Sequence, residues 1–292
     1  MRERGMKRSK TVDTLMRCLF TVCGFLSIIF VIVITAFLVS SGVPAVGEIG
    51  IKDFLFGTTW ASTAKNPEYG ILPFILSSVY GTFGAILLGV PFGVLCAVFL
   101  ARSANRRLSA VLSAVIELMS GIPSVVYGLV GMIVIVPKVR EIFDLPDGAN
   151  MFSAIIVLAI MILPSVISIS QTAIQAVPQE YEEASLALGA TKTETIFKVT
   201  LPAAKSGILA SIVLGIGRAL GEAMAVMMVA GNVANMPSLF KSVRFLTTAV
   251  ASEMSYSSGL QRQALFSIAL VLFVFILLIN LILNLVIKRE RK

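Results

Sequence analysis

The chain has 292 residues, of which 57% are hydrophobic and 14% are charged, and its formal net charge is +8. Because roughly a quarter of the residues in soluble domains are charged, this composition excludes an ordinary soluble protein. The chain contains no histidine, so it lacks the usual metal ligand and general base, which disfavours an enzyme. Its three cysteines, Cys18, Cys23 and Cys96, lie in or beside apolar segments and indicate neither a disulfide framework nor a zinc site.

Long segments with few charges predict an all-α membrane protein with six transmembrane helices. Four segments contain no Asp, Glu, Lys or Arg, and two more contain only isolated charges. Each is long enough for the roughly 20 apolar residues with which a helix crosses a bilayer. In chain order the segments lie between Arg17 and Glu48, Glu68 and Arg102, Arg107 and Lys138, Asp147 and Glu180, Lys205 and Lys241, and Arg262 and Lys288.

The distribution of basic residues predicts the orientation of these helices. The side with both termini carries 16 of the 24 Lys and Arg residues, and the other side carries 7. Because loops rich in Lys and Arg stay in the cytoplasm, we expect both termini to be cytoplasmic. The positive charge therefore indicates membrane topology, and no nucleic-acid partner is needed to explain it.

Residues 1–68 are predicted to form a first transmembrane helix and an external segment. The basic N-terminus and the apolar run to about Ser40 resemble a signal peptide, but the run is too long for one, so we expect an uncleaved helix. The external segment, from Gly42 to Tyr69, is rich in Gly, Pro and Thr and contains Trp60, the only tryptophan. The other five helices are predicted within residues 69–287.

The second span is predicted from about Ile71 to Leu100, and a basic turn from Arg102 to Arg107 leads into the third. The third span contains the run Gly121-Ile-Pro-Ser-Val-Val-Tyr-Gly128. A proline between glycines frees backbone groups that protein or water must satisfy. A kink that lines a cavity and a kink that only lets helices approach closely both remain open. Glu117, earlier in this span, is expected near the cytoplasmic end of its helix.

The fourth, fifth and sixth spans are predicted at about Met151–Ala176, Ala203–Val233 and Gln263–Ile287. The fifth contains Arg218 and Glu222, and a charge deep in a membrane costs at least ~2.5–3.5 kcal/mol, so it indicates function. Their spacing of four residues predicts that the two side chains share one helix face and can pair. The neighbouring glycines, at 217 and 221, leave open space there. A purely structural ion pair is the alternative.

Between the fourth and fifth spans lies a polar island, residues 177–202, with four of the chain's sixteen acidic residues. Pro178 suits a first helical turn, and Gly189 permits the left-handed conformation that ends a helix. Thr191 and Glu194 have capping-box spacing, so a second helix is expected to begin there and to continue into the fifth span. This pattern predicts a docking element for a partner. A linker lying on lipid headgroups is the alternative, which the acidic residues disfavour.

The polar island resembles the EAA loop of ABC importer permeases. The matching residues are Glu183, Ala184, Ser185, Gly189, Leu201 and Pro202, with Ser185 in place of the second alanine. The resemblance implies the type I importer permease architecture, in which this loop is a coupling helix that sits in a groove of a cytoplasmic ATPase. These six residues would then couple the chain to the ATPase.

Four motifs in order resemble the permeases of the bacterial phosphate (Pst) importer. They are residues 122–128, 187–191, 201–204 and 217–222, and the continuation to Asn232 resembles the PstC-like branch more than the PstA-like one. Ala223 departs from the Gly-Glu-Thr of many family sequences. The resemblance implies a phosphate pathway containing Arg218, Glu222, Ser124 and Tyr127, in a bacterial cytoplasmic (inner) membrane.

The partners implied by the resemblance are a PstA-like permease, a pair of PstB-like ATPases and an extracytoplasmic PstS-like phosphate-binding protein, besides membrane lipid. The nucleotide-binding pattern G-x-x-x-x-G-K-[ST] does not occur in the sequence, so ATP would be bound by the partner ATPase, and we expect the chain to carry no cofactor or metal. The alternatives are the PstA-like partner, a permease for molybdate or sulfate, a secondary transporter or channel, and, least favoured, a membrane enzyme.

Overall fold

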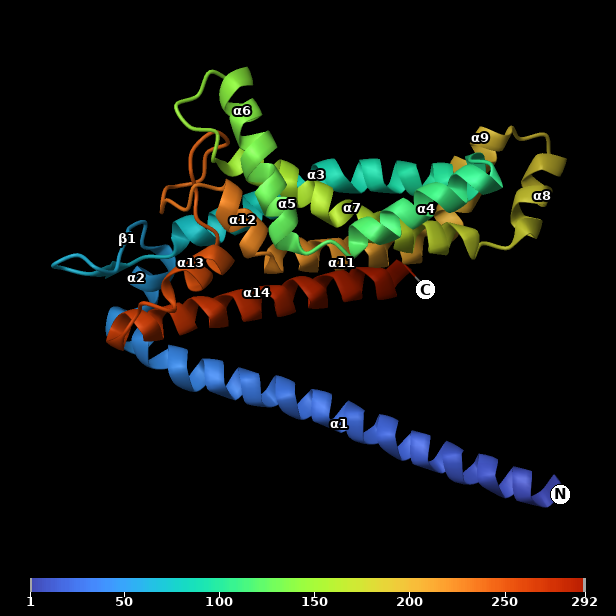
Figure 1. Cartoon of the computed structure of the whole chain (residues 1–292), viewed down its shortest axis with the longest axis horizontal. Helices are drawn as coiled ribbons and strands as arrows, with labels where there is room; N and C mark the ends of the chain where they lie inside the picture. Colours follow the sequence, from blue (N-terminus) through green and yellow to red (C-terminus); the bar gives the residue numbers. More distant parts are fainter. Residues whose placement is uncertain (1, 291–292) are drawn as a thin grey trace.

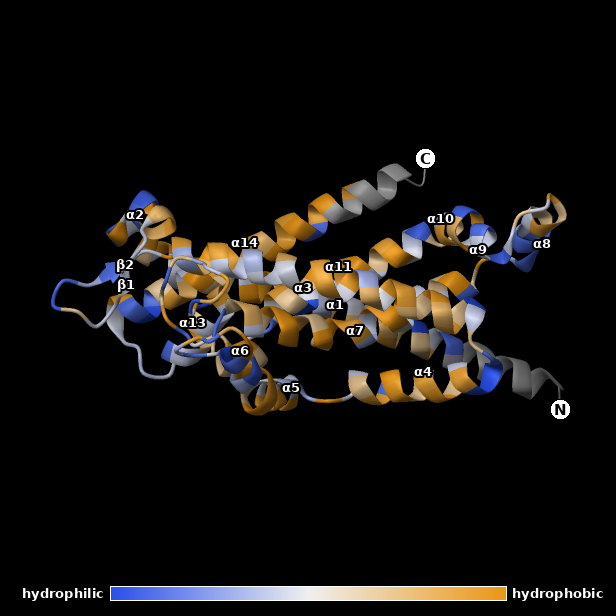
Figure 2. Cartoon of the chain, turned by 90° about the horizontal axis from the view of Figure 1, so that it is seen from above, coloured by the Kyte–Doolittle hydropathy of each residue, from blue (hydrophilic) through white to orange (hydrophobic). Residues whose placement is uncertain are grey.

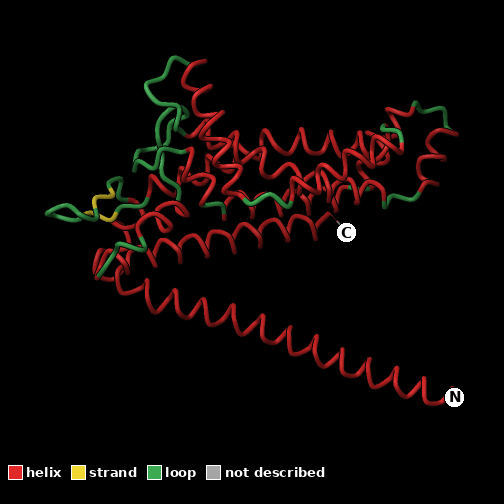
Figure 3. Tube along the Cα trace, in the orientation of Figure 1, coloured by secondary structure: helices red, strands yellow, loops and turns green. Residues whose placement is uncertain are grey.

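The computed structural model describes the backbone of residues 2–290 and the side chains of residues 13–282 and 285. It is a bundle of long helices with one small hairpin (Figure 1, Figure 3). The long helices are α1 (Arg2–Ile49), α3 (Leu72–Val98), α4 (Arg106–Ser120), α7 (Met151–Gln175), α11 (Lys205–Gly221) and α14 (Gly259–Glu290). The short helices are α2 (Ile51–Phe56), α5 (Ser124–Val130), α6 (Val136–Ile142), α8 (Gln179–Ala187), α9 (Lys192–Thr195), α10 (Leu201–Ala203), α12 (Met224–Val229) and α13 (Leu246–Glu253). Three π-helical turns, η1 (Phe99–Ser103), η2 (Gly131–Ile135) and η3 (Ile196–Thr200), and the strands β1 (Trp60–Ala61) and β2 (Glu68–Tyr69) complete the set.

Six membrane spans are found in the part of the chain that the structure describes, if each bent helix pair is counted as one. Four helices are long and apolar enough to cross unbroken: α1, α3 with η1, α7 and α14. The segment from α4 to α6 is bent by 96°, and the segment from α9 to α11 is bent by 69°. Hydrophobic residues follow the long helices, and hydrophilic ones gather at the two ends of the bundle (Figure 2). The predicted helical membrane architecture is confirmed, and its third and fifth spans are broken.

Helix α7 is the centre of the bundle. Of its most apolar stretch, 61% is buried inside the structure, against none of α1. Helix α3 packs along it through glycines: a Cβ added to Gly89 would lie 2.8 Å from the Ile162 side chain, and one added to Gly93 would lie 2.8 Å from Val166. Since small residues let helices approach closely in a membrane, these glycines explain why α3 and α7 lie side by side.

Helix α1 is longer than predicted. We expected it to end at about Ser40, but it continues through Gly42 and Pro44 to Ile49, so the first part of the predicted external segment is helical. Gly42 lies against the backbone of α14, where a Cβ would be 2.9 Å from the Ser267 nitrogen, and the Ser267 hydroxyl donates to the Gly42 carbonyl at 2.7 Å. The composition of the residues after Ser40 favours a loop, but this contact with the distant helix α14 stabilises them as helix. Away from the crossing, α1 diverges from the bundle (Figure 1).

The two ends of the bundle differ in what they carry (Figure 1). At one, which we call the hairpin end, lie α2, the β1–β2 hairpin, α6 and α13. At the other, the island end, lie α8, α9, the start of α4 and the first residues of α1. These predicted cytoplasmic segments thus lie at the same end of the molecule, as the distribution of basic residues requires, with the first residues of α1 standing away from the bundle.

At the hairpin end, the Glu253 carboxylate holds four elements together. It accepts hydrogen bonds from the Trp60 indole at 3.2 Å and from the Gln261 amide at 3.1 Å, and it pairs with Arg244. Ser62 adds a bond at 3.3 Å. These residues belong to the hairpin, to α13, to α14 and to the loop before α13. Helix α13, which the hydrophobic pattern did not predict, therefore joins the hairpin to the bundle.

The first prediction concerns orientation. A tag near Asn105, at the island end, should be reachable only from the cytoplasm, and a tag near Asn66, in the hairpin, only from outside, because Lys and Arg are concentrated at the island end. Protease protection in intact cells and in inverted vesicles measures this. Cleavage of the Asn105 tag from outside the cell would refute the assigned orientation.

Glu253→Ala should loosen the hairpin end. Arg244 would keep a mostly buried charge without its carboxylate, since the two side chains are 18% and 20% exposed. We expect a loss of about 1–3 kcal/mol, below the ~3–5 kcal/mol of a fully buried pair. The single tryptophan, Trp60, reports this as a red shift of its fluorescence. Glu141→Ala, at an exposed position of the same end, is the control and should leave the spectrum unchanged. An unshifted spectrum in Glu253→Ala would show that the carboxylate does not hold the hairpin.

Candidate functional site

Arg218 lies near the end of α11, inside the membrane-spanning bundle. Its guanidinium donates to the Ser165 hydroxyl of α7 at 2.9 Å. No acidic side chain among the described residues forms an ion pair with it. An Arg inside a membrane that has only a neutral partner keeps its full positive charge available for an anion.

A hollow of about 580 Å³ lies beside Arg218, between α7, α11 and α14. Ser165, Gly217 and Asn280 are among its lining residues. A Cβ added to Gly217 would meet nothing within 4 Å, so the predicted open space beside the charge is present. Asn280 was not singled out from the sequence, although an amide in the apolar run of the last span is a usable signal, which Asn280 shares with Asn284. The hollow therefore combines a cation, a hydroxyl and an amide.

Glu222 does not pair with Arg218, which corrects the prediction from their spacing. Helix α11 ends at Gly221, and Glu222 has an extended backbone with φ −74° and ψ 126°. The spacing rule holds only within one continuous helix. The Glu222 carboxylate instead accepts from the Ala225 N–H at 2.9 Å, at the start of α12, and its carbonyl accepts from the Thr247 hydroxyl at 2.7 Å. The predicted continuous helix from Ala203 to Val233 is therefore wrong.

The break in the third span brings α5 against α12. A Cβ on Gly128 would lie 2.7 Å from the Ala225 Cα, so here the bend serves close helix packing. The Tyr127 hydroxyl donates to the Met119 carbonyl across the bend at 2.8 Å. Tyr127 also lies within electrostatic range of Arg218. Ser124 is half-buried in the first turn of α5, and neither it nor Tyr127 lines the hollow beside Arg218.

We expected Glu117 near the cytoplasmic end of its helix, but it lies far from that end. It lies eleven residues after the start of α4, about 16 Å along the helix, and its side chain is exposed. On the same helix, Val111 and Leu118 are 62% and 74% exposed. A carboxylate on a free face inside a membrane requires a polar cavity or a partner protein next to it.

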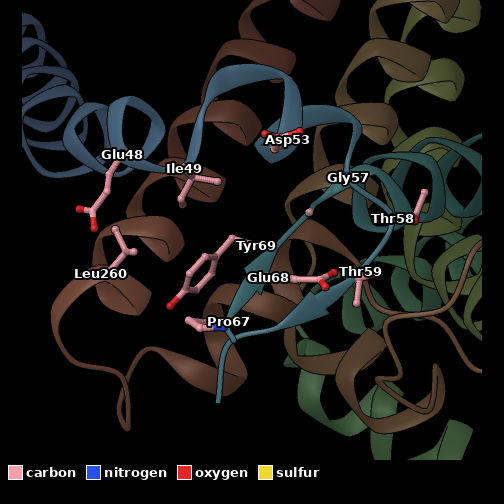
Figure 4. Close-up of a pocket in the computed structure, with 11 residues that line it drawn as sticks. Glu48, Ile49, Asp53, Gly57, Thr58, Thr59, Pro67, Glu68, Tyr69 and Leu260 are labelled. Carbon is pink, nitrogen blue, oxygen red and sulfur yellow. The ribbon is translucent and has the colours of Figure 1, made fainter. Parts of the chain in front are cut away.

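A second pocket, of about 500 Å³, lies at the hairpin end between α1, α2 and the hairpin (Figure 4). Glu48, Asp53 and Glu68 line it together with Tyr69. Burial, and then the Glu48 carboxylate, raise the pKa of Tyr69 above its ordinary value. Three carboxylates would repel an anion, so this pocket does not suit an oxyanion.

The polar island forms the predicted helix–glycine–helix. Helix α8 starts after Pro178, Gly189 has a φ of +89°, and Thr191 and Glu194 form the reciprocal capping box. The Thr191 hydroxyl accepts from the Glu194 N–H at 3.2 Å, and the Glu194 carboxylate accepts from the Thr191 N–H at 3.0 Å. The second helix runs on through η3 and α10, but it bends by 69° at Ala204 and does not continue straight into α11.

Helix α8 presents an open surface. Tyr181, Leu186 and Leu188 are 54%, 42% and 90% exposed, and Glu183 and Ala184 are exposed beside them. Ser185 is half-buried and shares a hydrogen bond of 2.9 Å with the Thr195 hydroxyl, which gives the serine a role that an alanine could not have. Of the remaining two EAA positions, Leu201 is half-buried and Pro202 is exposed, in α10 just before the bend.

Comparison with protein families places residues 89–292 in the family described as "Binding-protein-dependent transport system inner membrane component". Among curated proteins, the chain is 39% identical to the "Probable ABC transporter permease protein YqgH" of Bacillus subtilis, over 90% of this chain and 88% of that protein. It is 34% identical to the "Phosphate transport system permease protein PstC" of Pasteurella multocida, over 82% and 80%. It is 32% identical to PstC 2 of Mycobacterium tuberculosis, over 94% and 91%.

Solved structures share the fold. A permease chain in inward-facing conformations of the MetNI methionine ABC transporter is 20% identical, with a TM-score of 0.56 over 76% of this chain and 94% of that one. A chain of a bacterial ABC transporter for import of alginate is 16% identical, with a TM-score of 0.59 over 84% and 93%. At these identities the likeness concerns the arrangement of the helices alone.

Gly189→Val should distort the turn after α8. Valine at a φ of +89° costs about 1–3 kcal/mol, while the space around the position is open, so backbone strain is the only cause. If this turn docks an ATPase, as its resemblance to the EAA loop implies, the protein should insert normally and the ATPase should copurify at a reduced yield. Gly189→Asn is the control, because asparagine tolerates the left-handed region, and it should retain most of the ATPase. Equal recovery of the ATPase with valine and with wild type would contradict a docking role for this turn.

Proposed function

Because the chain belongs to the family of binding-protein-dependent transport system inner membrane components, we propose that it is the PstC-like permease subunit of an ATP-driven phosphate importer. It would form the translocation pathway together with a PstA-like second permease. The ATP would be bound and hydrolysed by a pair of PstB-like ATPases, and phosphate would be delivered by a PstS-like extracytoplasmic binding protein. The membrane would be the bacterial cytoplasmic membrane, with both termini inside.

The observation that carries this proposal is the unpaired guanidinium of Arg218. It lies beside a hollow, and its hydrogen-bond partner, Ser165, is neutral. A guanidinium offers a planar set of donors that matches two phosphate oxygens, and such charge-assisted bonds are about twice as strong as neutral ones. Ser165 and Asn280 would add uncharged hydrogen-bonding groups. Because no carboxylate neutralises Arg218 in advance, the guanidinium would offer its full positive charge to a tetrahedral oxyanion.

Glu222 has a different role in this proposal from the one its spacing suggested. Its carboxylate is occupied by the Ala225 N–H, so it shapes the break between α11 and α12 and leaves Arg218 free. Tyr127 and Ser124 would line the pathway from the α5 side, close to that break. Movement of α12 or α5 would therefore change the surroundings of Arg218.

The mechanism that we propose is alternating access. ATP-driven closure of the two ATPases would displace α8, and the bent spans would open the pathway to the outside. The exposed apolar and acidic surface of α8 supports its contact with another protein. Glu117 and the exposed face of α4 support the presence of a second permease, because lipid is a poor environment for a carboxylate.

Two alternatives differ in substrate or subunit. The names of the curated relatives support a PstC-like subunit over a PstA-like one and phosphate over molybdate or sulfate. The chemistry of Arg218 alone suits all three oxyanions. Phosphate uptake that is insensitive to excess sulfate and molybdate would separate them. A secondary transporter or channel would need no ATPase, so uptake without ATP would favour that reading.

Arg218→Leu should strongly reduce oxyanion transport without preventing assembly. Loss of a charge-assisted hydrogen bond of about 1.5–3 kcal/mol corresponds to roughly a 10- to 150-fold fall in uptake. Arg218→Lys keeps the charge but loses the planar fork, so it should retain part of the rate. The measurement is phosphate uptake by complexes reconstituted with the ATPase and the binding protein.

Glu222→Gln is the matched control, since a glutamine oxygen can still accept from the Ala225 N–H. It should alter uptake less than Arg218→Leu does. If Arg218→Leu transports phosphate at the wild-type rate, Arg218 does not contact the substrate and its role is structural.

A further inference from the structure

Arg102 lies in η1, at the island end of the second span, and reaches two other segments of the chain. Its Nε lies 2.6 Å from the Glu182 Oε1 in α8. One terminal nitrogen of the guanidinium donates to the carbonyls of Ile174, at 2.9 Å, and Val177, at 3.4 Å. The Nε–carboxylate contact is an ion pair without hydrogen-bond alignment. One side chain thus bridges the ends of the second and fourth spans and the coupling helix.

Glu182 extends this connection to a fourth segment. Its Oε1 also accepts from the Thr200 hydroxyl at 3.0 Å, and Thr200 is fully buried at the end of η3. We call Arg102, Glu182, Thr200 and the two carbonyls of residues 174 and 177 the Arg102 clamp. It joins η1, the end of α7, α8 and η3.

The attachment of α8 depends on such polar contacts. None of the residues of α8 is buried, so no apolar core holds the helix to the bundle. Apart from the chain on either side of it, α8 is held by Glu182 and by the bond between Ser185 and Thr195. The charged groups of the clamp are only 20% and 22% exposed, so solvent and salt screen their attraction weakly.

Arginine is suited to this position for a geometric reason. Its fork of donors can reach a carboxylate and two carbonyls at once, whereas a lysine ammonium is a single point charge. The carbonyls belong to Ile174, in the last turn of α7, and to Val177, two residues past its end, where a cation is also favoured by the helix dipole. Arg102 therefore fixes α8 and the end of α7 relative to each other.

We propose that Arg102 is a positioning residue that transmits displacement of α8 to the second and fourth spans. This inference rests on the proposed function in that an ATPase supplies the displacement. When α8 moves, Glu182 pulls the guanidinium, and the guanidinium pulls η1 and the end of α7 with it. Without Arg102, α8 would move with its ATPase while the spans beside Arg218 stayed behind.

Two measurements on Arg102→Met test this in the reconstituted complex. The first is hydrogen–deuterium exchange of the α8 amides, which should become at least 5-fold faster when the clamp is lost. The second is the amount of phosphate transported per ATP hydrolysed, which should fall at least 10-fold while the ATPase stays bound and active. Arg102→Lys should fall between Arg102→Met and wild type in both.

Arg107→Met is the matched control, because Arg107 belongs to the same basic turn and is exposed. It should leave both quantities unchanged. Glu182→Gln provides a second variant should Arg102→Met fail to assemble. It keeps the acceptor for Thr200 and removes only the charge, and it should also uncouple transport from ATP hydrolysis.

The outcomes distinguish a failure of the proposed clamp from a failure of the proposed phosphate substrate. Unchanged α8 exchange in Arg102→Met would overturn the clamp, and faster exchange with normal coupling would leave Arg102 a purely structural role and overturn its part in transmission. If the wild-type complex takes up no phosphate, the proposed substrate is wrong. The clamp is then still decided by α8 exchange together with stimulation of the ATPase by the binding protein, which Arg102→Met should reduce at least 10-fold.

Discussion

A bilayer offers no hydrogen bonds to an interrupted helix, and the architecture of this protein follows from that constraint. The third span is broken at residues 121–123, and the fifth is bent at Ala204 and broken again at residues 222–223. At 121–123 and at 222–223 the protein supplies hydrogen bonds of its own. The Tyr127 hydroxyl donates to the Met119 carbonyl. The Glu222 carboxylate accepts from the Ala225 N–H, and the Glu222 carbonyl accepts from the Thr247 hydroxyl. Because the buried helix α7 packs against both broken spans, their irregular backbone lies against protein and is tolerated inside the membrane.

The same constraint explains why one charge is left unpaired. Glu222 is four residues from Arg218 and would neutralise it if α11 continued. Ending α11 at Gly221 turns the carboxylate toward the start of α12 and leaves the guanidinium with Ser165. The discontinuity therefore separates two opposite charges that a regular helix would bring together, and this separation is what makes the site suitable for an anion.

Features with local causes could be predicted from the sequence. The left-handed Gly189 and the Thr191–Glu194 capping box depend on neighbours within a few residues, and the spans depend on composition. Features with distant causes could not be. The extension of α1 past Ser40 depends on Ser267, the end of α11 at Gly221 depends on Thr247, and the contacts of Arg102 lie more than seventy residues along the chain. Asn280 joins the hollow only because α14 packs beside α11.

The π-helical turns have a consequence for how this family can vary in length. A π turn holds one residue more than an α-helix of the same span, so an α turn with one residue fewer covers about the same rotation. Deleting one residue from η1 would therefore restore α-helical geometry and leave the flanking helices near their present orientation. The deletion would act locally, on residues within the turn such as Arg102 in η1 and Thr200 in η3. Relatives should therefore differ in length by one residue more readily at η1 and η3 than in the α-helical parts of the same spans.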